Sequence, residues 1–341
     1  MSAHIYPTFP FYVEEELTDV RVLGAFEGGA SSLAALDAKS RDTGERQLVV
    51  AFERPTRLSL TERTKTEQEL HDIRRYLADA GRPEGTYRIA PGPIANKPPD
   101  AIVTIDGVQQ RVEASQLVFP GPAGDGAGLN NLARTAQFEL LKEHLIKQSG
   151  KLKARTRQHR GMLVCLWFGA AGSGPRERLA PRAKSIEELI DHLKCTAPPA
   201  VGTTGPGGAE SGESIAYNAD ESIGCTWISL PPNDKATLFR VLGFDIALAY
   251  HQTTRMSDVL REITKIVADH DSDRNDVLVI TVNAPTRGGW YFPTGGILAD
   301  FLWRSIDELQ IPPPSHLKSV FLHDQTQHRL HRLYPPMSSR D

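Results

Sequence analysis

Two carboxylates in the stretch PPDAIVTIDGVQQRVEASQLV, residues 98–118, have the types and spacing that could do chemistry. Asp100 lies at the entrance to an apolar run, and Glu113 lies inside the next run between Val112 and Ala114. The Asp-Gly dipeptide between the two runs is a strong signal for a tight hairpin turn, so we expect two antiparallel strands. The two acids are therefore expected on neighbouring strands of one hairpin.

Side chains on a strand alternate between its two faces, so Arg111, Glu113 and Ser115 are expected on one face of the second strand. Asp100 begins the preceding strand and can approach Glu113 across the pair. Hard divalent cations such as Mg²⁺ and Mn²⁺ prefer oxygen ligands. A metal held by this pair could activate water and stabilise the charge that develops at a phosphorus atom. The alternative interpretation is the ordinary polar outer face of a hairpin.

Helices and strands on both sides of this hairpin in the chain would have to position it. Residues 61–81 predict a helix, because Leu70, Ile73 and Leu77 recur at helical spacing and Gly81 is a natural stop. A short strand is expected at 87–94. The later part predicts a helix from about Ser257, a buried strand at 276–284, a helix at 295–310, and a final strand pair at 319–324 and 331–335.

The rest of the chain is less regular. Strands are predicted at 47–55, 161–169 and 225–230, and helices at 129–157 and 185–194. Ser185 and Glu188 have the spacing of a capping box at the start of the second of these helices. The segment 196–214 is rich in glycine and proline, and we interpret it as a mobile loop.

Helices and strands alternate along the chain, which predicts an α/β or α+β fold with a mixed sheet. The 341 residues fit one elaborated domain or two smaller ones. We divide them into a strand-rich N-terminal segment (1–60), a core (61–119 and 251–335), and an insertion (120–250) with its mobile loop near 196–224.

Composition excludes several classes of protein. The formal net charge of −3 gives no global case for a nucleic-acid partner, although local patches could still exist. No apolar run approaches the roughly 18 residues that span a bilayer, and the first residues lack the pattern of a signal peptide. Three cysteines without a CxxC motif favour a reducing cytoplasm over a disulfide scaffold.

A basic run follows the long predicted helix. Its cations could track a phosphate backbone, or they could stabilise the C-terminal end of the helix as a solvated face. The residues of this candidate nucleic-acid surface are Lys147, Lys151, Lys153, Arg155, Arg157 and Arg160. A second group, His323, His328 and His331, suggests either metal ligation or ordinary surface histidines.

The motifs PPDAIV, IDG and RVEASQLV, preceded by an acidic helix, resemble the PD-(D/E)XK, or restriction-endonuclease-like, nuclease superfamily. More narrowly, they resemble bacterial members that have Glu-x-Ser or Glu-x-Thr in place of Glu-x-Lys. In those relatives an insertion follows the strand, and a helix with a spaced lysine then leads into a buried strand. The resemblance implies a central mixed sheet flanked by helices, with an inserted helix–strand subdomain.

By this resemblance, Asp100 and Glu113 would be the ligands of Mg²⁺ or Mn²⁺. Glu67 or Glu69 on the first helix would be an auxiliary acid; spacing does not choose between them, and we favour Glu67. Ser115 departs from the family because it stands where a lysine is expected. Lys265 is the candidate for a lysine that has moved to another element, and the alternative is an ordinary surface lysine.

The resemblance predicts a metal-dependent nuclease of the bacterial cytoplasm that cleaves DNA or, as a second choice, RNA, in defence or nucleic-acid processing. The competing hypothesis is a catalytically inactive module of the same fold that binds nucleic acid or serves as a subunit of an assembly. The segment GGWYFPTGGILADFLW, residues 288–303, could form an interface with a partner protein or a second copy, or simply a packed helix with its lead-in loop. No membrane partner is expected.

Overall fold

The computed structural model describes residues 2–6, 9–13, 16–23, 33–53, 56–57, 61–93, 98–117, 147, 156–160, 162–168, 183–197, 216–217, 223–229, 245–291 and 293–336. The chain forms two compact units, each made of two separate segments. Unit 1 comprises Met1–Thr56 and Pro120–Arg255, and unit 2 comprises Arg57–Phe119 and Met256–Asp341.

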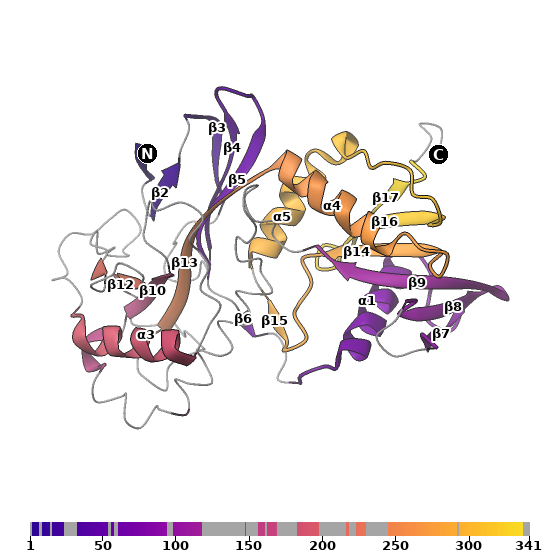
Figure 1. Ribbon diagram of the computed structural model, residues 1–341, viewed down its shortest axis with the longest axis horizontal. Helices are drawn as coiled ribbons and strands as arrows, with labels where there is room; N and C mark the ends of the chain where they lie inside the picture. The colour runs from indigo at the N-terminus through magenta and orange to yellow at the C-terminus, as the bar shows by residue number, and fades with distance from the viewer. Residues whose placement is uncertain are drawn as a thin grey trace. The chain divides into compact units, whose positions relative to one another are not determined.

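Unit 1 is built on a seven-stranded sheet with the order β11-β12-β10-β13-β5-β4-β3 (Figure 1). Its strands are β3 (Leu17–Leu23), β4 (Leu33–Ser40), β5 (Arg46–Glu53), β10 (Met162–Phe168), β11 (Ala216–Tyr217), β12 (Ile223–Ser229) and β13 (Asp245–Arg255). The unit also contains β1 (Ser2–Tyr6), β2 (Phe9–Val13), the 3₁₀ turn η1 (Arg157–His159) and α3 (Ala183–Cys195). The N-terminal strands and those of the insertion, treated as separate segments in our prediction, thus share one sheet.

Unit 1 differs from the prediction in two respects. The strand β13 was not predicted, and it forms because it pairs with β10 on one side and β5 on the other. The helix α3 begins at Ala183, so Ser185 lies inside the helix and is not its N-cap. Of the predicted helix at 129–157 the structure describes only Lys147, Thr156 and Arg157, and Arg157 begins the 3₁₀ turn η1; most of the glycine- and proline-rich loop lies outside the described residues.

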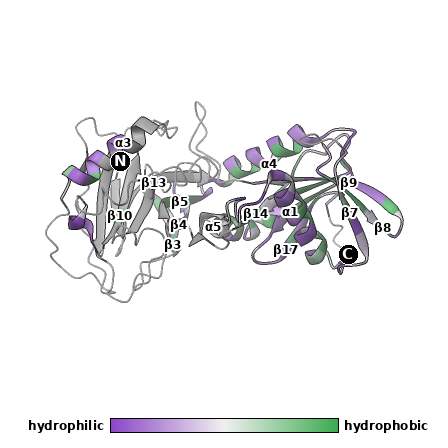
Figure 2. Cartoon of the chain, turned by 90° about the horizontal axis from the view of Figure 1, so that it is seen from below, coloured by the Kyte–Doolittle hydropathy of each residue, from purple (hydrophilic) through white to green (hydrophobic). Residues whose placement is uncertain are grey.

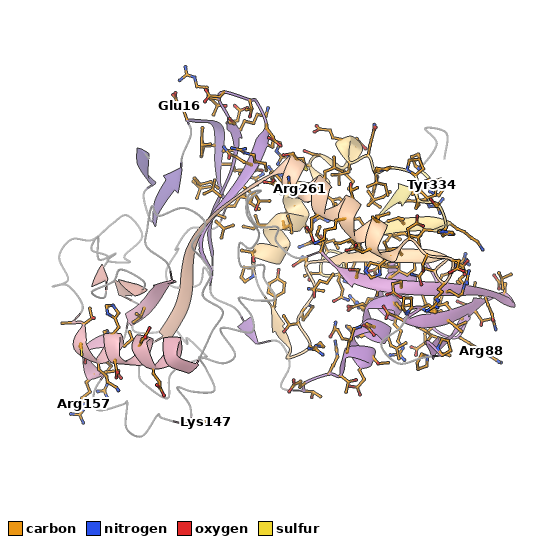
Figure 3. The ribbon with its side chains drawn as sticks, in the orientation of Figure 1. Glu16, Arg88, Lys147, Arg157, Arg261 and Tyr334 are labelled. Carbon is orange, nitrogen blue, oxygen red and sulfur yellow. The ribbon has the colours of Figure 1, made fainter. Side chains whose placement is uncertain are left out.

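Unit 2 is built on a six-stranded sheet with the order β17-β16-β14-β9-β8-β7. Its elements are α1 (Lys65–Asp79), β7 (Tyr87–Pro91), β8 (Ala101–Ile105), β9 (Val108–Gln116), α4 (Met256–His270), β14 (Val277–Val282), β15 (Trp290–Tyr291), α5 (Pro293–Trp303), the 3₁₀ turn η2 (Ile306–Glu308), β16 (Ser319–Asp324) and β17 (Arg329–Tyr334), while β6 (Thr56–Arg57) spans the boundary of the units. Figure 3 labels Arg88 on β7 and Tyr334 on β17, the two edge strands.

The sheet of unit 2 is mixed, as predicted. Strands β7, β8 and β9 are antiparallel, β9 and β16 both run parallel to β14, and β17 is antiparallel to β16. All six residues of β14 are buried, which explains why its sequence is apolar on both faces. The fold of the described chain is therefore mixed α/β.

The helix α1 covers one face of this sheet. Ile73, Tyr76 and Leu77 form a buried cluster with Val112 and Val279 from β9 and β14. Figure 1 shows α1 on one side of the sheet and α4 on the other. Because Val112 faces α1 and neighbouring side chains of a strand alternate, Glu113 is directed toward the side of α4.

The helix α4 follows the predicted apolar pattern, and it buries Val259, Ile263 and Val267. Figure 2 shows hydrophilic and hydrophobic residues alternating along α4, as expected for a helix with one side against a sheet. The next helix, α5, was predicted to continue to 310 but ends at Trp303. Its last turn tightens, because the amide of Ser305 donates to the carbonyl of Leu302, three residues back.

Within the part of the chain that the structure describes, every helix is too short or too polar to cross a membrane.

Candidate active site

Strands β8 and β9 bring Asp100 and Glu113 together. The register pairs Ala101 with Val112, so the next position of the ladder places Asp100 opposite Glu113. At this point the carboxylates replace backbone carbonyls as acceptors. The amide of Asp100 donates to Glu113 Oε2 (3.1 Å), and the amide of Ala114 donates to Asp100 Oδ2 (3.0 Å). Each carboxylate is thus oriented by an amide of the opposite strand.

Gly92 helps to fix the backbone at Asp100. Its amide donates to the Asp100 carbonyl (2.8 Å). A Cβ atom at this position would lie only 1.8 Å from the carbonyl oxygen of Pro99. Gly92 is therefore required by the close approach of the two segments, and its place in the sequence is tied to the position of Asp100.

Glu113 is buried, with 6% of its surface exposed, and its second oxygen faces a histidine. His270 Nδ1 lies 3.3 Å from Glu113 Oε1. His270 is the last residue of α4, and its carbonyl accepts a hydrogen bond from Asn275 Nδ2 (2.9 Å). His270 at the end of α4 therefore faces one oxygen of Glu113, while the amide of Asp100 donates to the other.

The surroundings of Asp100 disfavour its negative charge. Burial raises the pKa of this carboxyl to about 7, and the charges of Glu113 and Glu69 act in the same direction. The hydrogen bond from Ala114 and the charge of Lys65 act against this rise. Asp100 can therefore exchange a proton near neutral pH, or its charge can be stabilised by a bound cation.

The first turns of α1 contribute one acid and one base to this region. Lys65 Nζ lies 3.1 Å from Glu69 Oε1. Lys65 and Glu69 continue, at four-residue spacing, the side of α1 on which Ile73 and Leu77 are buried. The hydrogen bond to Glu69 raises the pKa of Lys65, and the negative charges of Glu69, Asp100 and Glu113 add to this effect. Lys65 thus interacts electrostatically with both acids of the pair, and Glu69 interacts with Asp100.

Glu67, the auxiliary acid favoured from the sequence, has a different role in the structure. Its carboxylate accepts hydrogen bonds from the amide (2.7 Å) and hydroxyl (2.9 Å) of Thr64, and these bonds lower its pKa. Thr64 and Glu67 form a capping box that starts α1. Since two helical positions correspond to about 200°, Glu67 points away from Glu69. In the structure Glu69 interacts electrostatically with Asp100, whereas Glu67 belongs to the cap of α1.

Lys265 is likewise not directed toward the pair. Its side chain is exposed on α4, whereas Ile263 and Val267 face the sheet. Lys265 and His270 are five positions apart, which is about 140° around the helix. The structure therefore brings His270 to Glu113 and leaves Lys265 on the outward side of α4.

The sequence prediction missed Lys65 and His270. The spacing of Lys65 and Glu69 in the first turns of an acidic helix was a usable signal, because residues four apart on a helix are neighbours. His270 gave no comparable signal, since its contact with Glu113 depends on how α4 is placed against β9. Ser115 lies two residues after Glu113 and is partly buried, so the position expected to hold a lysine offers no positive charge.

Of the basic run, the structure describes Lys147, Arg157 and Arg160, and all three are exposed. Figure 3 labels Lys147 and Arg157. These residues belong to unit 1, whereas Asp100 and Glu113 belong to unit 2. Lys151, Lys153 and Arg155 lie outside the described residues. Their proposed contact with nucleic acid stays a prediction.

Two of the three C-terminal histidines contact one carboxylate, that of Asp79. His323 Nε2 lies 2.7 Å from Asp79 Oδ2, and His328 Nδ1 lies 3.0 Å from Asp79 Oδ1. Arg75 also contacts the ring of His328 (3.2 Å). These contacts join the end of α1 to the β16–β17 hairpin, which gives His323 and His328 a structural explanation.

The donor atoms around Asp100 suit a magnesium ion that keeps much of its water. Across the described ranges, no group of three or more His, Cys, Asp or Glu residues could hold a metal ion by itself. Mg²⁺ commonly binds through one or two carboxylates together with water and substrate phosphates, so the pair fits this ion. It does not fit a site such as structural zinc, which needs four protein ligands.

Comparisons of the chain with protein-family models, with curated proteins and with solved structures gave no match. The chemical capacity of the site is therefore read from its own geometry. The site offers the two oriented carboxylates of Asp100 and Glu113, and the carboxyl group of Asp100 titrates near neutral pH. Lys65 lies within electrostatic range of both.

Proposed function

We propose that this chain is a Mg²⁺-dependent hydrolase that cleaves phosphodiester bonds of nucleic acid, with DNA as the first substrate to test. The observation that carries the proposal is the facing pair of Asp100 and Glu113, each held by an amide of the other strand. Two carboxylates so close together repel each other, and the burial of Glu113 strengthens this repulsion. An arrangement of this kind is expected where a cation binds.

Asp100 and Glu113 would hold the metal ion. Once bound, Mg²⁺ would polarise a phosphoryl oxygen and lower the pKa of a water molecule. The residues of the chain orient the ligands: His270 and the amide of Asp100 fix the two oxygens of Glu113, while the amide of Ala114 fixes Asp100. Glu69 adds a third negative charge next to Asp100.

The order of elements in unit 2 also supports the proposal. An acidic helix (α1) is followed by the hairpin with Asp100 and Glu113, and after the inserted segment a helix (α4) leads into a buried strand (β14). This is the order implied by the resemblance to PD-(D/E)XK nucleases. The departures are Ser115 and the outward position of Lys265.

Cleavage assays with active-site variants would test the proposal. Supercoiled plasmid, linear duplex, single-stranded DNA and single-stranded RNA are incubated with the chain and Mg²⁺ or Mn²⁺. We expect cleavage by the wild type and its loss in Asp100→Asn and Glu113→Gln. Asp106→Asn, in the exposed turn of the same hairpin, is the control and should cleave normally.

The second candidate function is a catalytically inactive module that binds nucleic acid, and the observation that favours it is Ser115. Cleavage of none of the four substrates, together with their retention in a binding assay, would support this candidate. Cleavage that persists in both Asp100→Asn and Glu113→Gln would instead show that the activity resides elsewhere.

A further inference from the structure

We propose that Lys65, from the first turn of α1, supplies to the bound phosphate the positive charge that Ser115 cannot supply. This inference rests on the proposed function and assigns one residue of the same site. Lys65 would be a catalytic residue that contacts the scissile phosphate.

The charge balance of the site calls for such a residue. Asp100 lies within electrostatic range of both Glu113 and Glu69, and Lys65 interacts with all three acids. A phosphodiester brings a further negative charge. One Mg²⁺ ion cannot balance all four charges, so an anionic substrate would be repelled unless a side-chain cation lies close by.

The other basic side chains near the pair in the described part of unit 2 contact other groups or point away. Both ends of the Arg111 guanidinium donate to Asp276 (2.9 and 3.1 Å) or to the carbonyl of Asp273. His270 faces Glu113, and Lys265 lies on the outward side of α4. Lys65 also pairs with an acid, Glu69, but among the described residues its electrostatic interactions extend to both carboxylates of the pair.

The position of Lys65 is unusual for a lysine, and it allows the side chain to contact a bound phosphate. It is the first residue of α1, where the helix dipole disfavours a positive charge. The contact with Glu69 offsets this effect and holds the ammonium on the sheet-facing side of the helix. Its side chain is nevertheless 56% exposed, so a phosphate can reach it from solvent.

Glu69 gives this lysine a defined chemical role. A lysine with its ordinary pKa of 10.5 is already an ammonium at neutral and mildly alkaline pH, and the neighbouring carboxylates raise the pKa of Lys65 further. It therefore acts as a cation and hydrogen-bond donor, not as a general base. An arginine at the same position should retain this role in large part, whereas a neutral side chain of similar length should not.

The experiment compares Lys65→Met, Lys65→Arg and the double variant Lys65→Met/Ser115→Lys with the wild type. The matched control is Lys265→Met, which removes an exposed lysine from the outward side of α4. Removing one preorganised donor from a transition state typically costs about 100-fold or more in rate, and we expect such a loss for Lys65→Met. Lys65→Arg and the double variant should cleave at least tenfold faster than Lys65→Met, and Lys265→Met should cleave like the wild type.

Mg²⁺ binding to each variant, measured by calorimetry without substrate, gives a second readout. Lys65 repels a divalent cation at the pair, so Lys65→Met should bind Mg²⁺ several-fold more tightly, and Lys265→Met should bind as the wild type does. Lys65→Met that cleaves normally, or that leaves the Mg²⁺ affinity unchanged, would overturn the assignment of Lys65 alone. A wild type that cleaves no substrate would overturn the proposed function and this inference with it.

Discussion

Replacing Asp100 by asparagine should stabilise the chain, although it removes a proposed metal ligand. The pKa of Asp100 is raised from its ordinary value of 3.8 to about 7, chiefly by burial. A carboxyl group with a raised pKa binds its proton more tightly in the folded state. Its contribution to stability is therefore fully present below about pH 4 and is lost as the pH rises through 7. Asparagine is nearly isosteric, keeps an oxygen for the amide of Ala114, and carries no charge.

The size of the effect follows from the two pKa values. Each pKa unit corresponds to about 1.4 kcal/mol, so the interval from 3.8 to about 7 sets a ceiling of roughly 4 kcal/mol. Asp100 is only partly buried, and solvent screens part of this energy. We therefore expect Asp100→Asn to raise the free energy of unfolding by about 2 kcal/mol at pH 8.5 and to leave it nearly unchanged at pH 4.

The measurement is urea-induced unfolding in the absence of divalent cations. Hydrogen exchange of peptides from β8 and β9, detected by mass spectrometry, monitors the unfolding. Asp106→Asn in the turn of the same hairpin is the control. Adding Mg²⁺ at about 100 times its dissociation constant should stabilise the wild type by roughly 2.7 kcal/mol and the variant by much less. A variant that is no more stable than the wild type at pH 8.5, or whose advantage is the same at both pH values, would contradict the explanation.

Three other changes test neighbouring parts of the structure. Gly92→Ala places a Cβ atom 1.8 Å from the Pro99 carbonyl oxygen. Thermal melts should show that the free energy of unfolding falls by about 1–3 kcal/mol, and Mg²⁺ titrations should show that the ion stabilises this variant less than the wild type. The control Val108→Ala, at an exposed site, should show neither effect. Glu67→Ala removes the capping box and should lower the melting temperature but leave Mg²⁺ affinity unchanged, whereas Glu69→Gln removes a negative charge near Asp100 and should lower Mg²⁺ affinity. Equal Mg²⁺ affinities of the two variants would refute the distinction. Arg111 and Lys318 hold the pKa of Asp276 well below its usual range. Asp276→Asn should therefore lower the free energy of unfolding by about 2 kcal/mol at pH 7 and by almost nothing in strongly acidic solution, where Asp276 is protonated. Urea titrations at several pH values would measure this difference.

The hairpin and its two acids could be predicted from the sequence because every signal for them is local. The Asp-Gly turn fixes the register, and the alternation of side chains then places Asp100 opposite Glu113. The same holds for the stripe of α4 and for the fully apolar β14. The choice between Glu67 and Glu69 depended on the first residue of α1. The Thr64-x-x-Glu67 capping box, which the sequence also contains, would have identified Glu67 as part of the cap.

What could not be predicted depends on tertiary placement. The contact between His270 and Glu113 exists because α4 returns to β9 after the whole inserted segment. The strand β13 is defined by its two neighbours in the sheet, and its own sequence shows little alternation. The role of Lys65 likewise emerges only when the start of α1 is known to lie near the hairpin.

The interleaving of the two units has a consequence for how the chain folds during synthesis. The polypeptide passes from one unit to the other three times, at residues 56, 119 and 255. Unit 1 can be complete when residue 255 has left the ribosome, but β9 must wait for β14, its parallel partner. Until then the hairpin with Asp100 and Glu113 has an unpaired edge, and such edges are prone to aggregation. Once unit 1 has folded, the effective loop between β9 and α4 is shorter, and β9 can pair with β14 more readily. Slow folding of unit 1 is therefore expected to delay assembly of the acid pair.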